Sequence, residues 1–184
     1  RVVVKITNWC GAGGDLEGEV VEALGSRLLP SITALSIARE FNLPEAFPPA
    51  VDHAAKSVPS SVSAHELYGR EDLRGAELFT IDGDDAKDFD DAVSVKKLPG
   101  GGYELGVHIA DVSNYVKEGG PLDAEAFKRG TSVYLVDRVI PMLPPALSEG
   151  ICSLKEGVDR LAVSCVMGID PHGRIVSDRL FRSV

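Results

Sequence analysis

The chain has 184 residues, of which 44% are hydrophobic and 26% charged, and its 28 acidic and 19 basic side chains give a net charge of −9. This composition is typical of a globular protein and excludes wholesale disorder. The acidity also argues against a protein that binds nucleic acid through bulk positive charge. The charge is uneven, because residues 80–91 hold six Asp and one Lys, a net of −5, whereas residues 92–184 hold 11 acids and 11 bases.

The cysteines are odd in number and far apart, at Cys10, Cys152 and Cys165, and the four histidines show no pair at metal-ligand spacing. A structural zinc site is therefore not expected. No apolar run reaches the roughly 20 residues that span a bilayer. We expect a reduced, cytoplasmic protein. Because the chain starts at Arg1 rather than Met, we also expect a fragment of a longer protein.

The N-terminal residues predict two strands. Residues 2–7 are rich in β-branched side chains, and residues 18–25 form a second short strand-type run. The glycines Gly11, Gly13 and Gly14 predict the turn between them. Two strands do not form a stable unit alone, so residues 1–25 are expected to be the end of a β-barrel.

Residues 26–76 are punctuated by proline and predict a helical connector. Ser31 is the expected N-cap of a helix over residues 32–41, which carries apolar side chains at helical spacing. A shorter helix is expected over residues 48–55. A third begins at Ser63 with a Ser-x-x-Glu capping box.

Residues 77–184 mix strand-type and helical segments without regular alternation, which favours a mixed-sheet α+β architecture. The expected strands are 77–81, 91–95, 103–109, 133–136, 160–169 and 174–180. The expected helices are 122–129, closed by Gly130, and a short turn at 144–148. Turn-type residues at 99–102 and 170–173 predict hairpins.

Four carboxylates lie close together in sequence at Asp82, Asp88, Asp90 and Asp91, between apolar strand-type flanks. Like charges at this density repel, and a buried unpaired carboxylate is costly. A hard divalent cation with oxygen ligands compensates such charges best, and Mg²⁺ uses few protein carboxylates together with water and substrate phosphate.

Three interpretations of this acidic run compete. A solvated loop is the ordinary one for a run of charge. A calcium loop fails on spacing because, counted from Asp82, glycine stands second rather than sixth and Val93 replaces the glutamate expected at the twelfth place. A catalytic metal site acting on phosphate is favoured by the apolar flanks, which draw the loop toward a core.

The segment Asp82-Gly-Asp-Asp-Ala-Lys-Asp-Phe-Asp-Asp-Ala92 resembles the signature motif of the ribonuclease II/ribonuclease R family. It resembles the bacterial ribonuclease R branch more than ribonuclease II. The resemblance continues in order through residues 106–113, 128–134, 137–144, 147–154 and 158–162. It implies an α+β fold in which residues 77–184 are the N-terminal part of an RNB catalytic domain. Residues 1–25 would then end a cold-shock (OB-like) barrel, with 26–76 as the helical connector.

The resemblance implies a hydrolytic 3′→5′ exoribonuclease that releases nucleoside 5′-monophosphates from the 3′ end of single-stranded RNA, with Mg²⁺ as cofactor or Mn²⁺ in its place. By position, the catalytic and metal-binding residues would be Asp82, Asp88, Asp90 and Asp91. Two metal ions would serve the attacking water and the leaving oxygen. Tyr134 would stack on the terminal base, and phosphates would be held by Lys128, Arg129 and Arg138.

Family members also carry earlier cold-shock barrels, the rest of the catalytic domain and an S1 barrel, so we expect this chain alone to be inactive. The alternative is a non-catalytic RNA-binding or partner-docking module with a solvated acidic loop. His108 is expected to be a satisfied core histidine, and Cys152 and Cys165 to be buried small hydrophobes. Asn114 stands where relatives often carry His, and we expect no consequence for the chemistry.

Overall fold

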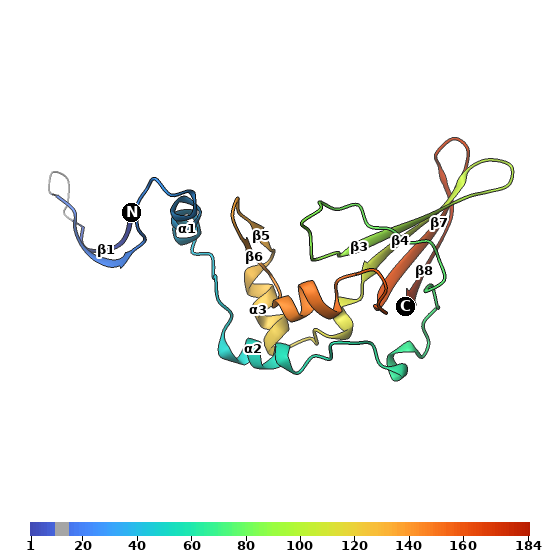
Figure 1. The fold of residues 1–184 in the computed structure, drawn as a ribbon, viewed down its shortest axis with the longest axis horizontal. Coiled ribbons are helices and arrows are strands. Elements are labelled where there is room, and N and C mark those ends of the chain that lie inside the picture. Colours follow the sequence, from blue (N-terminus) through green and yellow to red (C-terminus); the bar gives the residue numbers. More distant parts are fainter. Residues whose placement is uncertain (10–14) are drawn as a thin grey trace. The chain divides into compact units, whose positions relative to one another are not determined.

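The computed structural model describes residues 1–9 and 15–184 (Figure 1). Cys10 and the glycine turn predicted at 11–14 lie outside the described residues. The chain forms two compact units, Arg1–Phe47 with Thr131–Met142, and Pro48–Gly130 with Leu143–Val184. In the described part of the chain, no helix combines the length and the apolar character needed to cross a membrane.

The first unit contains the antiparallel pair β1 (Val2–Asn8) and β2 (Glu17–Ala23), as predicted, followed by helix α1 (Pro30–Glu40). The cap of α1 was predicted wrongly. Leu29 is the N-cap and Pro30 opens the helix, so Ser31 lies inside it. Proline suits the first helical turn because its missing N–H would be unsatisfied there in any case.

The segment of the first unit from residue 131 to 142 is a short hairpin of β5 (Val133–Tyr134) and β6 (Val139–Ile140). The strand predicted over 133–136 is only two residues long. The N–H of Leu135 donates to the carbonyl of Arg138 at 2.8 Å and turns the chain back. The second strand, β6, was not predicted.

A four-stranded sheet forms the centre of the second unit, in the order β3 (Asp91–Lys97), β4 (Tyr103–Ala110), β7 (Ala162–Ile169) and β8 (Ile175–Ser183) (Figure 1). The four strands pair antiparallel, which confirms both predicted hairpins. An isolated bridge between Glu71 and Ser183 adds a parallel pairing. The α+β class is confirmed.

The strand predicted over residues 77–81 does not form. Phe79 alone of that segment pairs with the sheet, in an isolated antiparallel bridge to Val93. The two N–H···O bonds of this bridge measure 3.0 and 2.8 Å. Beyond Phe79 the chain leaves the sheet to enter the acidic segment, so Thr80 and Ile81 have no strand partner.

Helices α2 (Pro49–Lys56) and α3 (Pro121–Arg129) pack against each other in the second unit, and α2 also contacts the π-helical turn η3 (Ala146–Ile151). The helical turn predicted at 144–148 lies slightly later in the chain and is one residue longer. Gly130 ends α3 with φ of 75°, a conformation that glycine adopts without strain. The core side chains of this layer include Val51, Ala55, Leu122, Leu147 and Ile151.

Two 3₁₀ turns complete the second unit, η1 (Ala64–Leu67) and η2 (Val112–Asn114). The capping box predicted at Ser63 is confirmed. The backbone N–H of Ser63 donates to Glu66 Oε2 at 2.8 Å, and the Ser63 side chain caps the start of the turn.

A line of polar side chains crosses the sheet, with one residue from each strand, and all but the β3 residue are buried. His108 on β4 contacts Ser94 Oγ on β3 at 3.0 Å and Ser164 Oγ on β7 at 2.7 Å. Ser164 Oγ in turn lies 2.6 Å from Ser183 Oγ on β8. Burial lowers the pKa of His108 below its ordinary value, which favours the neutral ring. The prediction of a satisfied core histidine is confirmed.

Candidate active site

The acidic segment forms a loop, residues 82–91, that we call the carboxylate loop. It starts with a turn in which the N–H of Ala86 donates to the carbonyl of Gly83 at 3.0 Å. It ends where Asp91 enters β3 opposite Ile109. At that end the N–H of Ala110 donates to the Asp90 carbonyl at 2.9 Å, so the sheet fixes the backbone of the last two aspartates.

A second anchor holds the middle of the carboxylate loop, around Asp88. The fully buried Ser153 accepts a hydrogen bond from the N–H of Phe89 at 3.0 Å and donates its hydroxyl to the Lys87 carbonyl at 2.7 Å. The N–H of Leu154 donates to the Phe89 carbonyl at 2.9 Å. The predicted tendency of the loop to be drawn toward a core is thus realised through backbone hydrogen bonds.

The carboxylates of the loop lie near enough to influence one another. The pKa of Asp90 is raised, first because protein atoms remove water from its carboxyl and then because Asp88, Asp91 and Asp82 carry like charge. Asp88 is half-buried, whereas the residues Asp82, Asp90 and Asp91 retain exposed surface. The structure therefore brings the four predicted aspartates into one electrostatic cluster.

The donor chemistry of this cluster suits a hard divalent cation, since carboxylate oxygens are the ligands that Mg²⁺ and Mn²⁺ prefer. A cation would also reverse the repulsion that raises the pKa of Asp90. Among residues 1–9 and 15–184, no group of three or more His, Cys, Asp or Glu side chains is arranged to hold a metal ion. The residues that could supply ligands are Asp82, Asp88, Asp90 and Asp91.

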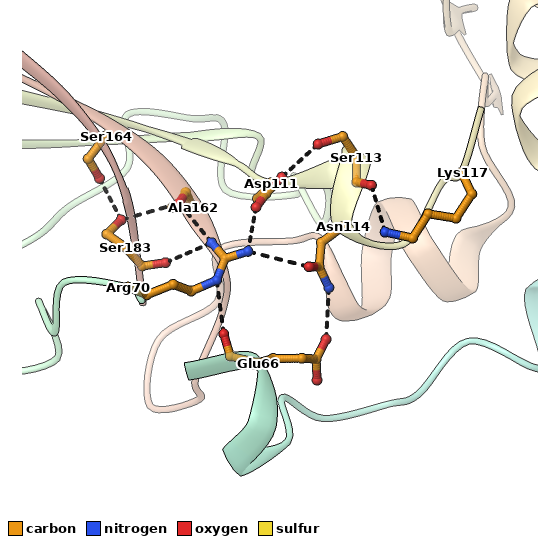
Figure 2. Close-up of polar contacts among 9 residues, drawn as sticks. All are labelled: Glu66, Arg70, Asp111, Ser113, Asn114, Lys117, Ala162, Ser164 and Ser183. Carbon is orange, nitrogen blue, oxygen red and sulfur yellow. Dashed lines mark hydrogen bonds and ion pairs between the residues drawn. The ribbon is translucent and has the colours of Figure 1, made fainter. Parts of the chain in front are cut away.

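A different carboxylate, Asp111, lies one residue beyond β4 and is paired with Arg70 (Figure 2). Arg70 Nη2 lies 2.6 Å from Asp111 Oδ2, and the two side chains are only 4% and 2% exposed. Burial by itself would raise the pKa of Asp111, but hydrogen bonds from Arg70 and Ser113 lower it below its ordinary value. Sequence reasoning missed this pair, whose partners are 41 residues apart.

Arg70 also binds the backbone of three other segments (Figure 2). Its guanidinium donates to the carbonyls of Glu66 at 3.0 Å and of Ala162 and Ser183 at 3.3 Å each. Asn114 bridges the same group, since it accepts from Arg70 at 3.4 Å and donates to Glu66 Oε1 at 2.8 Å. Asn114 thus has a structural role that its sequence position did not reveal.

The residues predicted to bind RNA divide between the two units. In the first unit, Tyr134 is 64% exposed on β5, and Arg138 lies 3.2 Å from Glu45 and 3.0 Å from Asp137. In the second unit, Lys128 is exposed near the end of α3. The Arg129 guanidinium is 2% exposed and lies 2.9 Å from the carboxylate of Glu125, so a phosphate contact would require it to leave that pair.

The two described cysteines differ. Cys152 is buried as predicted, and burial, followed by the nearby negative charge of Asp90, raises the pKa of its thiol to about 12. A thiol held in the protonated form is a poor nucleophile. Cys165 is only half-buried on β7, so its predicted burial was wrong in degree. Neither the position nor the environment of these thiols suggests catalysis.

Two protein families match parts of this chain. Residues 70–184 match the RNB domain, and residues 1–48 match the cold shock domain. The chain belongs to the RNB domain family. The resemblance noted in the sequence is thereby confirmed, and the carboxylate loop, Ser153 and Arg70 all lie inside the matched RNB range.

The relatives that this RNB chain matches include ribonucleases R. It is 54% identical over 186 residues to ribonuclease R of Thermotoga maritima, a match that covers the whole of this chain and 26% of the relative. Its structure matches Mycoplasma genitalium RNase R in complex with ribose methylated single-stranded RNA, with a TM-score of 0.88, 30% identity, and coverage of 99% of this chain and 28% of that one. The double-stranded RNA complex of the same protein gives the same TM-score and identity, with 99% and 32% coverage.

The RNB chain therefore spans about a quarter of the length of the curated relative first named above. RNB-family exoribonucleases generally depend on divalent metal ions. Divalent metal ions of this kind prefer carboxylate oxygens, and the carboxylate loop is rich in them.

Proposed function

We propose that this chain is the carboxylate-bearing part of a 3′→5′ exoribonuclease that releases nucleoside 5′-monophosphates from single-stranded RNA. The observation that carries the proposal is the carboxylate loop. Its four aspartates form one electrostatic cluster inside the RNB range, and its backbone is held by both the sheet and a buried serine. A run of charge that served solvation alone would not need two anchors.

In this proposal Asp82, Asp88, Asp90 and Asp91 hold Mg²⁺, or Mn²⁺ in its place. When bound, the metal supplies an activated water and neutralises charge that develops on the phosphate. The protein contributes the position of the carboxylates. Asp90 and Asp91 are fixed at the start of β3, and Asp88 is fixed by the anchored backbone on either side of it.

The RNA partner is the 3′ end of a single strand. Tyr134 offers an exposed ring on which a base can stack whatever its identity. Lys128 offers positive charge for phosphates. Arg138 and Arg129 would join it only on leaving the carboxylates with which they pair. Mycoplasma genitalium RNase R, whose structures match this chain, binds ribose methylated single-stranded RNA in one complex and double-stranded RNA in another.

The proposed division of the chain follows the sequence analysis. In this division the last strands of a cold-shock barrel are residues 1–25, and the N-terminal part of the catalytic domain is residues 77–184. A helical connector, residues 26–76, joins the two. Because the chain spans about a quarter of its relative, we propose that it is inactive alone and works within a longer protein that supplies the remaining barrels and the rest of the RNA channel.

RNA degradation tests the proposal. The 184-residue chain and a longer protein that contains it are incubated with Mg²⁺ and single-stranded RNA labelled at either the 3′ or the 5′ end. We expect the longer protein to release labelled mononucleotide at once from the 3′-labelled strand only, and Asp90→Asn to abolish this release. Release that survives Asp90→Asn, or a longer protein that binds RNA without degrading it, would favour the non-catalytic module. Mononucleotide release by the 184-residue chain would refute its inactivity.

A further inference from the structure

We infer that Ser153 is a positioning residue for the carboxylate loop, holding the backbone around Asp88 against the mutual repulsion of the aspartates. This inference rests on the proposed function, because it assigns Ser153 to the same metal-binding site. Ser153 does not touch the carboxylates. It acts on them through the main chain of Lys87 and Phe89, the residues on either side of Asp88.

The hydroxyl of Ser153 uses both of its hydrogen-bonding roles on the loop. It accepts the N–H of Phe89 at 3.0 Å and donates to the carbonyl of Lys87 at 2.7 Å, across 64 and 66 residues of sequence. The next residue, Leu154, adds a third bond to the Phe89 carbonyl at 2.9 Å. These three bonds fix the backbone from which Asp88 projects.

Ser153 is itself held on a rigid base. It has no exposed surface, and its N–H donates to the carbonyl of Gly150 in η3 at 3.2 Å. Its carbonyl accepts a hydrogen bond from Arg160 Nε at 2.9 Å. The neighbouring η3 residue Ile151 is 1% exposed. A loop whose charges repel one another is thus tied to one of the most buried segments of the second unit.

The repulsion between the aspartates explains why the hydrogen bonds of Ser153 to the loop would matter for metal binding as well as for packing. Without a cation the aspartates favour a wider separation, whereas metal ligation requires them to converge. A loop held in place in advance loses less conformational freedom when the cation binds. Residues that orient metal ligands from outside the coordination shell typically change metal affinity by about 10- to 100-fold when they are mutated.

The test compares Ser153→Ala with Ser164→Ala in the 184-residue chain. Ser164 is a matched control because it is equally buried and also makes two side-chain hydrogen bonds, to His108 and Ser183, away from the loop. Mn²⁺ affinity is measured by electron paramagnetic resonance, and thermal stability is measured without metal. We expect both variants to lose stability, but only Ser153→Ala to bind Mn²⁺ about 10- to 100-fold more weakly.

Equal Mn²⁺ affinity in wild type and Ser153→Ala, with Asp90→Asn still defective, would overturn the positioning role and leave the proposed function intact. Equal weakening in Ser164→Ala would also overturn it, since general destabilisation would then explain the loss. If wild type and Asp90→Asn bind Mn²⁺ equally poorly, the proposed function fails and the positioning role with it. Should Ser153→Ala not fold, the nearly isosteric Ser153→Cys replaces it, and wild-type affinity in that variant would refute the inference.

Discussion

Asp90 and Asp111 lie close together along the backbone hydrogen bonds of the sheet, but the pKa values of their carboxyl groups shift in opposite directions. Asp111, beyond the end of β4, is buried with a guanidinium 2.6 Å away, and its pKa is lowered. Asp90, beside the start of β3, has a raised pKa, first because protein atoms remove water from its carboxyl and then because like charges lie nearby. The Asp90 carbonyl and the Asp111 N–H take part in consecutive backbone bonds, to Ala110 and Leu161.

In the proposed function, the Asp111 carboxylate stabilises the fold, whereas the Asp90 carboxylate serves the metal site. Where the fold needs a fixed carboxylate, the sequence supplies its cation, and Arg70 makes further bonds to three carbonyls. At the carboxylate loop, none of the causes that shift the pKa of Asp90 is a cation, and no described Lys, Arg or His forms an ion pair with that side chain. In the proposed function, a bound cation would supply at Asp90 the positive charge that Arg70 supplies at Asp111.

The largest expected effect comes from breaking the structural pair. Arg70→Ala leaves Asp111 buried without its cation and removes donors from the Glu66, Ala162 and Ser183 carbonyls. We expect a loss of about 3–5 kcal/mol in the free energy of unfolding, measured by urea denaturation followed by circular dichroism. Arg179→Ala is the control, since that exposed arginine pairs with Glu71 and its loss should have little effect. Equal losses in the two variants would contradict the structural role.

The next effect distinguishes the two sites by pH. The folded-state pKa of Asp111 lies below its ordinary value of 3.8, so the folded state binds fewer protons and stability from this pair is present above pH 3.8. That stability is lost as the pH falls through the lowered pKa. We expect the free energy of unfolding of the wild type to fall steeply below pH 3.8, and we expect a much flatter acid limb in the double variant Arg70→Met/Asp111→Leu. An unchanged slope would place the acid sensitivity elsewhere.

A smaller effect of opposite sign is expected at Asp90. Its folded-state pKa is raised above 3.8, so its contribution to stability is greatest below pH 3.8 and is lost as the pH rises through the raised value. Asp90→Asn should therefore stabilise the metal-free chain at pH 7, by less than about 1 kcal/mol because water screens this exposed residue. Thermal denaturation in a chelator measures it. Destabilisation by Asp90→Asn would show that the carboxylate is structural, like Asp111.

Local sequence predicted most of the fold. The turn residues at 99–102 and 170–173 fixed both sheet hairpins, and Ser63 with Glu66 predicted a capping box, because these signals act over a few residues. The strand over 77–81 failed because its apolar residues continue into a loop that leaves the sheet. Sequence alone could not tell that Phe79 was the last residue to pair.

The carboxylates of the candidate site were visible in the sequence, but the residues that hold the backbone of the loop were not. Six aspartates within ten residues, including the four predicted as ligands, can be seen directly in the sequence. Ser153 and Arg70 act across 64 and 41 residues, and nothing in their local sequence gives that distance. The Cys152-Ser153-Leu154 segment did belong to a family motif, and that was the one feature of the sequence that pointed to Ser153.

The most direct test of the central claim is a Mg²⁺ titration of the free energy of unfolding at pH 7 for wild type and Asp90→Asn. A cation that binds only the folded chain must stabilise it, by about 2.7 kcal/mol at 100 times its dissociation constant. We predict a concentration-dependent rise in wild type that is lost in Asp90→Asn, so that the variant is the more stable protein without Mg²⁺ and the less stable one with it. The same response to Mg²⁺ in both proteins, or none in wild type, would contradict a cation site at the carboxylate loop.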